Sequence, residues 1–360
     1  MKSINIKAER NYEVVVGADG LAAIKQISQE HNRVLLIAPN SLIKLFKLKE
    51  SKNLIIFATP EGENQKSVAT LERIWRKCAG ASIARGDAII GFGGGATTDL
   101  AGFAAATWLR GISWYAIPTS LAGMVDAAIG GKSGVNAATG KNLIGSFYSP
   151  TKVLIDPTFL KKLPVRDLSA GMAEVIKCGF ISDYKILNLV QEDEINYTEI
   201  IQRAVKVKAE VVSKDFRESR LREILNYGHT LGHAIEKDSK YKLRHGEAVS
   251  IGMVFAAENA LAAMEQDPQT RASLDAYTAG VNSFITQLNT SDLPIEYKLL
   301  GYEPEKWTNL KSSLFIKQMT NTLAGYDRDL EYTNALEILG EEKFRILYSD
   351  IPDSLYPVIN

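Results

Sequence analysis

The sequence predicts an α/β protein with a mainly parallel sheet in its first half and a mostly α-helical second half. Up to about residue 160, short apolar runs of strand length alternate with segments of helix length, which is typical of a parallel sheet with crossover helices. After Pro164, strand-like runs become scarce and long helical patterns dominate. A chain of 360 residues also exceeds one ordinary domain of ~100–200 residues. We therefore expect two domains, residues 1–160 and 161–360.

The strands are expected in order along the first domain. Residues 4–7 and 12–16 alternate as a hairpin around Arg10 and Asn11. Further apolar runs predict strands at residues 34–38, 54–58, 88–92, 114–118 and 153–156. Helix-length segments such as residues 65–79 separate these strands.

The second domain is expected to consist mainly of helices. Helical apolar periodicity covers residues 168–180, 198–214, 218–236 and 247–264. The cleft between the two domains is the expected ligand site.

Composition excludes several classes of protein. Lys plus Arg and Asp plus Glu number 42 each, and no long run of one sign occurs, which argues against bulk binding to nucleic acid or a membrane surface. The two cysteines, Cys78 and Cys178, exclude a disulfide scaffold and suit a reducing cytosol. The N-terminus lacks the apolar stretch of a signal peptide, and no run approaches the ~18 apolar residues of a membrane span. A soluble cytoplasmic protein is expected.

A glycine-rich turn joins an expected strand to an expected helix at residues 87–103. Gly91, Gly93, Gly94 and Gly95 let the backbone approach a pyrophosphate, and the start of a helix favours anions. The same glycines also fit a plain tight turn between a strand and a helix. Their spacing differs from the usual GxGxxG, which argues against an ordinary Rossmann domain.

Residues 218–236 are predicted as one helix with a polar stripe. At 100° per residue, the following side chains fall within an arc of about 80°: Glu218, Arg222, Asn226, His229 and His233. A solvated face rarely uses Asn and His where Lys and Glu would serve. Gly228 and Gly232 also cost helix stability unless close packing or bending requires them. The stripe therefore indicates a functional site.

The histidines of this stripe indicate a metal site. His229 and His233 are spaced as two ligands on one helix face, and His245 starts another expected helix. The usual metalloprotease motif has Glu directly after the first His, where Thr230 stands, which argues against a protease. Glu174 is the best carboxylate candidate to complete a catalytic metal site.

Several lysines beside glycine turns or apolar residues are candidates for phosphate or carboxylate contacts. Lys132 stands in the segment IGGKSGVN, and Lys141 and Asn142 in GKNLIGSF. Lys177 is three residues after Glu174, on the same helix face. Lys208 belongs to the expected helix at residues 198–214.

Six linked segments resemble the 3-dehydroquinate synthases of the sugar phosphate cyclase superfamily. They are GGGATTDLAGFAAATWLRG at 93–111, PTSLAGMVDAAIGGKSGVN at 118–136, GKNLIGSFY at 140–148, GMAEVIKCGFI at 171–181, ESRLREILNYGHTLGHAIE at 218–236 and HGEAV at 245–249. The resemblance is clear from about residue 60 to residue 262.

This resemblance implies a Rossmann-like N-terminal domain that binds NAD and a helical C-terminal domain that binds one divalent metal, zinc or cobalt. The implied reaction converts 3-deoxy-D-arabino-heptulosonate 7-phosphate (DAHP) to 3-dehydroquinate and phosphate in the shikimate pathway. NAD oxidises a carbinol, phosphate is eliminated, the carbonyl is reduced back, and ring opening and aldol closure follow. A homodimer is also implied.

The resemblance also implies roles for individual residues. The metal ligands would be Glu174, His229 and His245, which makes His233 a substrate-side or proton-transfer residue. The catalytic and substrate positions would be Asp126, Lys132, Lys141, Asn142, Lys177, Lys208, Glu218, Arg222, Asn226 and His233, with Arg110 supplied by the partner subunit. The NAD contacts would be Glu63, Lys66, Gly93, Gly94, Gly95, Asp99, Thr119, Ser120, Lys132 and Lys141.

The chain departs from the family pattern at two places. The D-K-K tripeptide that supplies a substrate lysine is absent after residue 262, where Lys317 and Arg328 are the candidates. An acidic ribose contact after the second strand is replaced by Ala38, Pro39 and Asn40.

Three other functions compete. A sibling cyclase acts on sedoheptulose 7-phosphate, like 2-epi-5-epi-valiolone synthase, or on glucose 6-phosphate; the retained GGKSGVN and GKNLIG segments favour DAHP. A metal-dependent polyol dehydrogenase would lack the lysine-rich pocket. A dinucleotide-binding regulatory protein with a decayed site is disfavoured by the full set of Glu174, His229, His245 and Lys132.

Overall fold

The computed structural model describes residues 2–137, 139–289, 293 and 304–313. The chain divides into two compact units, Met1–Ala256 and Ala257–Asn360. These two units do not test the domain boundary expected near residue 160, which stays a prediction. Every site residue expected between Glu63 and His245 belongs to the first unit.

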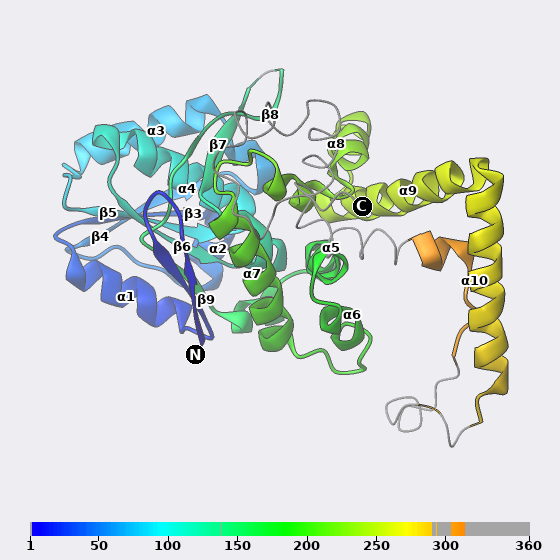
Figure 1. Cartoon of the computed structure of the whole chain (residues 1–360). Coiled ribbons are helices and arrows are strands. Elements are labelled where there is room, and N and C mark those ends of the chain that lie inside the picture. Colours follow the sequence, from blue (N-terminus) through cyan, green and yellow to red (C-terminus); the bar gives the residue numbers. More distant parts are fainter. Residues whose placement is uncertain (1, 138, 290–292, 294–303, 314–360) are drawn as a thin grey trace, which may run out of the picture. The chain divides into compact units, whose positions relative to one another are not determined.

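The first unit contains a seven-stranded sheet, as the α/β prediction requires (Figure 1). Its order is β1-β2-β9-β6-β5-β3-β4; β1 runs antiparallel to β2, and all other neighbours are parallel. The strands are β1 (Lys2–Ile6), β2 (Tyr12–Val16), β3 (Val34–Pro39), β4 (Leu54–Thr59), β5 (Ala88–Gly93), β6 (Ser113–Pro118) and β9 (Lys152–Ile155). Each expected strand is therefore confirmed, to within one or two residues at its ends.

Helices cover both faces of this sheet. They are α1 (Gly20–Glu30), α2 (Asn40–Leu45), α3 (Val68–Gly80) and α4 (Gly95–Thr107). Right-handed crossovers place α1 and α2 on one face and α3 and α4 on the other, and Figure 1 shows α1 and α3 on opposite sides. Because both faces are covered, every residue of β3 and β5 is buried. The helix expected at residues 65–79 is a 3-10 turn (Gly62–Gln65) followed by α3.

The order of the strands reverses between β3 and β5. The chain leaves β3 toward β4 at one side, then returns to place β5 on the other side of β3. In open α/β sheets, ligands bind outside the carboxyl ends of the strands at such a switch point. The glycine-rich turn follows β5 at this place.

A two-stranded antiparallel hairpin, β7 (Lys132–Ala137) and β8 (Gly140–Phe147), was not expected from the sequence. Its strands are rich in glycine and polar residues and lack apolar alternation. Its glycines allow close approach: a Cβ at Gly145 would lie 2.3 Å from the carbonyl oxygen of Ser133. The hairpin packs on α4, where a Cβ at Gly102 would lie 3.0 Å from that of Ser133.

Among the described residues after position 164, helices dominate, as expected. They are α5 (Val165–Ile181), α6 (Lys185–Leu189), α7 (Tyr197–Lys214), α8 (His229–Asp238), α9 (His245–Gln266) and, in the second unit, α10 (Pro268–Gln287). The helices expected at 168–180, 198–214 and 247–264 are confirmed by α5, α7 and α9.

The prediction of a single helix over residues 218–236 is wrong. A 3-10 turn (Leu221–Asn226) precedes a break at Gly228, whose φ is +77°, and α8 begins at His229. The prediction that their polar side chains share one arc of that helix is therefore wrong as well. The cause is packing against α9: a Cβ at Gly228 would lie 2.8 Å from Val249 O, and one at Gly232 would lie 3.1 Å from Val249 Cα.

Among the described residues, α9 is the one helix long and apolar enough to cross a membrane by length and composition. Such a helix is weak evidence by itself, because apolar helices of soluble proteins meet the same criteria. The first turn of α9 is tied to charged groups, since His245 contacts Glu174 and Glu247 pairs with Arg166. No membrane role is indicated.

Candidate active site

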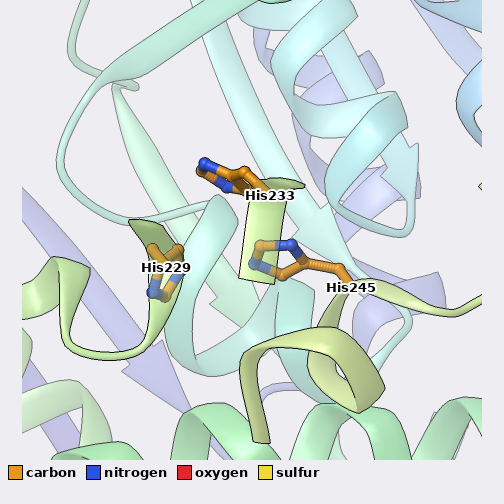
Figure 2. Close-up of side chains that lie close together, drawn as sticks. All are labelled: His229, His233 and His245. Carbon is orange, nitrogen blue, oxygen red and sulfur yellow. The ribbon is translucent and has the colours of Figure 1, made fainter. Parts of the chain in front are cut away.

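Three histidines lie together in the first unit. His229 and His233 come from successive turns of α8, and His245 is the first residue of α9. Their ligand nitrogens all lie within 4.8 Å of one another, and Figure 2 shows the three imidazoles side by side. The ring centroids are 5.1–5.6 Å apart.

Glu174 of α5 faces these histidines and is 1% exposed. Its Oε1 lies 3.6 Å from Nε2 of His229 and 3.3 Å from Nε2 of His245. Neither carboxylate oxygen has a hydrogen bond of regular geometry to any described residue. A buried carboxylate oxygen that lacks such a bond, beside two imidazole nitrogens, fits a divalent metal with N and O ligands.

The geometry brings together four possible ligands. Both ligand sets considered above, with His233 or with Glu174 as the third ligand, are compatible with this grouping. Nitrogens of His229 and His245 both approach Oε1 of Glu174. The contacts of His233 are with the imidazole rings of the other two histidines.

Electrostatics of the cluster differ from one histidine to the next. Burial and the charge of Lys177 lower the pKa of His229 to about 4. Burial would also lower the pKa of His245, but the neighbouring carboxylates of Glu174 and Glu236 raise it to about 10. Burial would raise the pKa of Glu174, yet Lys177 and the histidines hold it at about 2. The carboxylates of Glu174 and Glu236 therefore favour a positive charge at His245.

Two buried lysines connect Glu174 to Asp126. Asp126 lies in the turn Gly123–Ala127, and Lys208 of α7 donates to its carbonyl oxygen at 2.6 Å and its Oδ1 at 2.5 Å. Lys177 lies 2.5 Å from Glu174 Oε2 and 3.7 Å from Asp126 Oδ1. Burial would lower the pKa of Lys177, but the two carboxylates raise it, so this ammonium group stays charged.

Lys132 and Asn226 meet at Glu218. Lys132, at the start of β7, forms an ion pair with Glu218 Oε2, and Asn226 Nδ2 donates to Oε1 at 2.9 Å. Burial would raise the pKa of Glu218, but Lys132 and Asn226 lower it. The side chain of Lys132 is about half exposed, so an anionic ligand can reach it.

Arg222 is 2% exposed and holds a loop in place. Its guanidinium donates to the carbonyl oxygens of Phe216 at 2.5 Å and Gly130 at 2.9 Å. The structure therefore brings Arg222 beside the GGK turn, with its hydrogen bonds directed at the backbone.

Asp215 organises the same loop and was missed by the sequence analysis. Its carboxylate accepts from the backbone N–H groups of Ser219, Arg220 and Arg222 at 2.8–3.0 Å. An Asp at the end of a helix with a Ser four residues later is a weak signal, because such pairs occur in many loops.

Lys141 and Asn142 point to different partners. Lys141 Nζ donates to Glu236 Oε1 at 2.9 Å and lies 4.4 Å from the centroid of the Tyr241 ring. Asn142 Oδ1 accepts from Lys66. Glu236 was also missed, although it lies three residues after His233 on α8, a spacing that places both on one face.

The glycine-rich turn forms the start of α4. A Cβ at Gly93 would lie 2.4 Å from Thr97 Oγ1, and one at Gly95 would lie 2.8 Å from Ala127 Cβ, so both positions need glycine. Gly94 is the N-cap of α4, and Ser120 Oγ lies 3.2 Å from where its Cβ would stand. The backbone N–H of Thr119 donates to Gly93 O at 2.9 Å. The helix start and these short contacts fit a bound phosphate group.

Lys66 joins the turn to the hairpin. It is 4% exposed, and its Nζ lies 2.6 Å from Asp99 Oδ2 on α4 and 3.8 Å from Glu63 Oε1. Asn136 of β7 donates to Glu63 Oε1 at 2.8 Å. Four of the expected cofactor and substrate residues, Glu63, Lys66, Asp99 and Asn142, are therefore brought together.

Arg110 is not brought to this site. It is exposed and follows α4 at the end opposite to the glycine-rich turn. A helix of 13 residues is roughly 20 Å long at ~1.5 Å per residue. The candidates Lys317 and Arg328 lie outside the described residues.

Family models match most of the chain. Residues 56–170 match the N-terminal model of 3-dehydroquinate synthase, and residues 171–300 match its C-terminal model. Residues 248–354 also match a penicillin amidase model, which overlaps the end of the second match and covers less than a third of the chain.

Known relatives agree with the first two matches. A 3-dehydroquinate synthase of Streptomyces avermitilis is 43% identical over 84% of this chain and 84% of its own length. One from Thermobifida fusca is 44% identical over 86% of this chain and 84% of its own length.

Solved structures extend the likeness. A 2-deoxy-scyllo-inosose synthase in complex with carbaglucose-6-phosphate, NAD+ and Co2+ is 26% identical. The likeness covers 88% of each chain, with a TM-score of 0.64.

Proposed function

The chain belongs to the 3-dehydroquinate synthase family, and we propose that it uses NAD and one divalent metal to convert DAHP to 3-dehydroquinate and phosphate. The observation that carries this proposal is buried Glu174, which lacks a regular hydrogen bond and faces Nε2 of both His229 and His245. Three N and O ligands are typical of a catalytic zinc site.

We assign the metal to Glu174, His229 and His245, with His233 left free to exchange a proton. A metal ion held there would polarise the carbinol oxygens of the substrate and lower their pKa. Burial lowers the pKa of His233, so its imidazole is neutral and can accept a proton.

NAD is assigned to the switch point of the sheet. Gly93, Gly94 and Gly95 would face its pyrophosphate, while Glu63, Lys66 and Asp99 would lie beside the ribose. The chemistry that NAD would supply there is reversible hydride transfer at the carbinol carbon, with no net formation of NADH. The related inosose synthase was solved with NAD+, which supports this assignment.

The lysines recognise the anionic groups of the substrate. Lys132, Lys141, Lys177 and Lys208 each hold an ion pair with a carboxylate of the chain. These pairs keep the ammonium groups oriented, and a substrate phosphate or carboxylate can replace a carboxylate partner. Arg222 holds the loop that carries Glu218 and Asn226 against Gly130.

DAHP is favoured over the substrates of sibling cyclases. Identity is 43–44% to the two synthases above, and 26% to the inosose synthase. The hairpin residues Lys132, Lys141 and Asn142 also keep the pattern expected for DAHP.

A cytoplasmic homodimer is part of the proposal. Cys78 and Cys178 are both free and buried, which suits a reducing compartment. Arg110 would reach the partner's site, because it is distant from the glycine turn of its own chain.

Phosphate release from DAHP tests the proposed function. The protein is incubated with NAD and Zn2+ or Co2+, and the product is identified by mass. One phosphate per 3-dehydroquinate without net NADH is expected. Release only from sedoheptulose 7-phosphate would indicate a sibling cyclase, and release from neither substrate would contradict the proposal.

A further inference from the structure

Glu236 joins two residues that lie far apart in the sequence. It is in the last turns of α8 and is 2% exposed. Its Oε1 accepts from Lys141 Nζ on β8, and its Oε2 accepts from His245 Nδ1 at the start of α9, both at 2.9 Å. Both oxygens of this buried carboxylate are therefore satisfied by groups of the candidate active site.

We propose that Glu236 is a positioning residue that orients His245 for the metal and Lys141 for the substrate through one carboxylate. This inference rests on the proposed function, because that function assigns His245 to the metal and Lys141 to the substrate.

The orientation of His245 follows from its two ring nitrogens. When Nδ1 carries the hydrogen that Glu236 accepts, the lone pair of the neutral ring is on Nε2. That Nε2 faces Glu174 Oε1 at 3.3 Å. Glu236 thus selects the tautomer and the ring angle that a metal ligand requires.

The orientation of Lys141 depends on the same short segment. The carbonyl oxygen of Glu236 accepts from Tyr241 N–H at 2.8 Å, which turns the chain at the end of α8. The Tyr241 ring then lies against the ammonium group of Lys141. Lys141 is therefore held by the carboxylate of Glu236 and by an aromatic ring that the backbone of the same residue helps to place.

A buried carboxylate at this place is costly unless it is paired. Glu236 is 2% exposed, and the two partners that offset the cost of its burial are His245 and Lys141. The bridge to a metal-site histidine and a pocket lysine makes a role in both sites testable.

The test measures Co2+ affinity and substrate KM separately. Apparent dissociation constants for Co2+ are obtained by chelator competition for the wild type and for Glu236→Ala. We expect Co2+ binding to weaken about 10–100-fold, as for other partners of metal-bound histidines, and KM for DAHP to rise. A folded Glu236→Ala variant whose Co2+ affinity is within about threefold of wild type would overturn the inference.

Glu236→Gln keeps the inference falsifiable if Glu236→Ala does not fold. The amide oxygen can accept from one donor well, while the amide NH2 opposes the other. Either Co2+ affinity or KM must then change by more than about threefold. If neither changes, the bridge has no role in positioning.

Two matched variants separate the contributions. Lys141→Ala leaves the bond between Glu236 and His245 intact, so KM should rise while Co2+ affinity stays within about threefold. Glu247→Gln removes a carboxylate two residues after His245 that pairs with Arg166 instead, and it should change neither quantity. A change in Co2+ affinity of the same size in Glu247→Gln would assign the effect to the start of α9 as a whole.

Failure of this inference differs from failure of the proposed function. A wild-type protein that binds Co2+ and releases phosphate, with Glu236 variants that match it, removes only the positioning role. A wild-type protein that neither binds Co2+ nor releases phosphate removes both.

Discussion

Ala170 and Gly246 are in such close contact that a Cβ at Gly246 would lie 1.8 Å from the carbonyl oxygen of Ala170. Ala170 stands one helical turn before Glu174 on α5, and Gly246 directly follows His245 at the start of α9. The contact between the two backbones therefore brings the carboxylate of Glu174 to the imidazole of His245.

Gly246→Ala is expected to separate these two helices. The added methyl group meets backbone, which cannot rotate away, so the free energy of unfolding should fall by about 1–3 kcal/mol. Co2+ affinity should fall at least about tenfold, because Glu174 and His245 no longer meet. Gly80→Ala is the control, since a Cβ there has nothing within 4 Å. Chelator competition and urea unfolding measure both effects; unchanged Co2+ affinity would show that this contact does not set the site.

His229→Ala should abolish both metal content and turnover. Loss of a direct ligand should cost more than the about 10–100-fold that loss of an outer partner costs. Metal is measured by elemental analysis of the purified protein. The matched control is His31→Ala, since His31 contacts Gly86 O and Tyr115 outside the site. Retained stoichiometric zinc in His229→Ala would move the metal site elsewhere.

Lys132→Ala should reduce turnover while metal stays in place. A charge-assisted hydrogen bond to a substrate anion is worth about 1.5–3 kcal/mol, which corresponds to a loss of about 10–100-fold in kcat/KM. Lys152→Ala removes a comparably exposed lysine that pairs with Glu13, and it should leave kcat/KM unchanged. Near-normal rates in Lys132→Ala would remove this lysine from the pocket.

Asp215→Asn should destabilise the protein in a pH-dependent way. Burial would raise the pKa of Asp215, but the backbone N–H groups of Arg222, Ser219 and Arg220 bring it well below its ordinary value. A depressed pKa means that the carboxylate stabilises the fold above its unfolded pKa of about 4 and loses this effect as the pH falls further. At pH 7 the variant should lose about 1–3 kcal/mol of unfolding free energy.

Urea unfolding at several pH values checks this prediction. The difference between wild type and Asp215→Asn should shrink as the pH falls below about 4. Asp167→Asn, which breaks a partly exposed pair with Arg244, should cost at most about 1 kcal/mol. A difference for Asp215→Asn that stays constant across this range would mean that the carboxylate charge is not its source.

The strands of the sheet could be predicted because their signal is local. Each strand is a short apolar run. Because β3 and β5 are buried on both faces, their sequences consist almost entirely of apolar residues and glycine. The hairpin β7–β8 could not be predicted in this way. Gly134 and Gly145 are needed there for close backbone contact, and they interrupt the alternation of apolar and polar residues that marks a strand. The sequence nevertheless predicted that Lys132 and Lys141 of this hairpin are candidates for contacts with phosphate or carboxylate groups.

The helix expected at 218–236 shows why local periodicity fails at the site. Gly228 adopts its positive φ where Val249 and Met253 of α9 lie against it, and those residues are 21 and 25 positions further along the chain. Glu236 and Asp215 were missed for a related reason. Each is an ordinary acidic residue in the sequence, and its role depends on partners that only the fold brings near.

The region after residue 262 could not be predicted from the family pattern. The D-K-K tripeptide is absent there, and a penicillin amidase model matches residues 248–354. The second compact unit begins at Ala257, within that match. The departure from the family pattern and this second match therefore fall on the same part of the chain.

Mixed dimers test whether Arg110 acts in the partner's site. Arg110→Ala and Lys132→Ala are each expected to retain at most about a tenth of wild-type activity, and they are co-expressed with different tags. In a mixed dimer, the Arg110→Ala subunit keeps its own Lys132 and receives an intact Arg110 from its partner. Statistical pairing makes half of the dimers mixed, with one active site each, so about a quarter of wild-type activity should return.

The control pairs Lys132→Ala with His229→Ala, two residues assigned to the site of their own chain. Neither subunit of that mixed dimer has a complete site, so no activity should return. If Arg110 served its own chain, or if the protein were a monomer, the first mixture would also remain inactive. Recovery in the first mixture alone requires a dimer in which Arg110, at the distal end of α4, crosses to the other site.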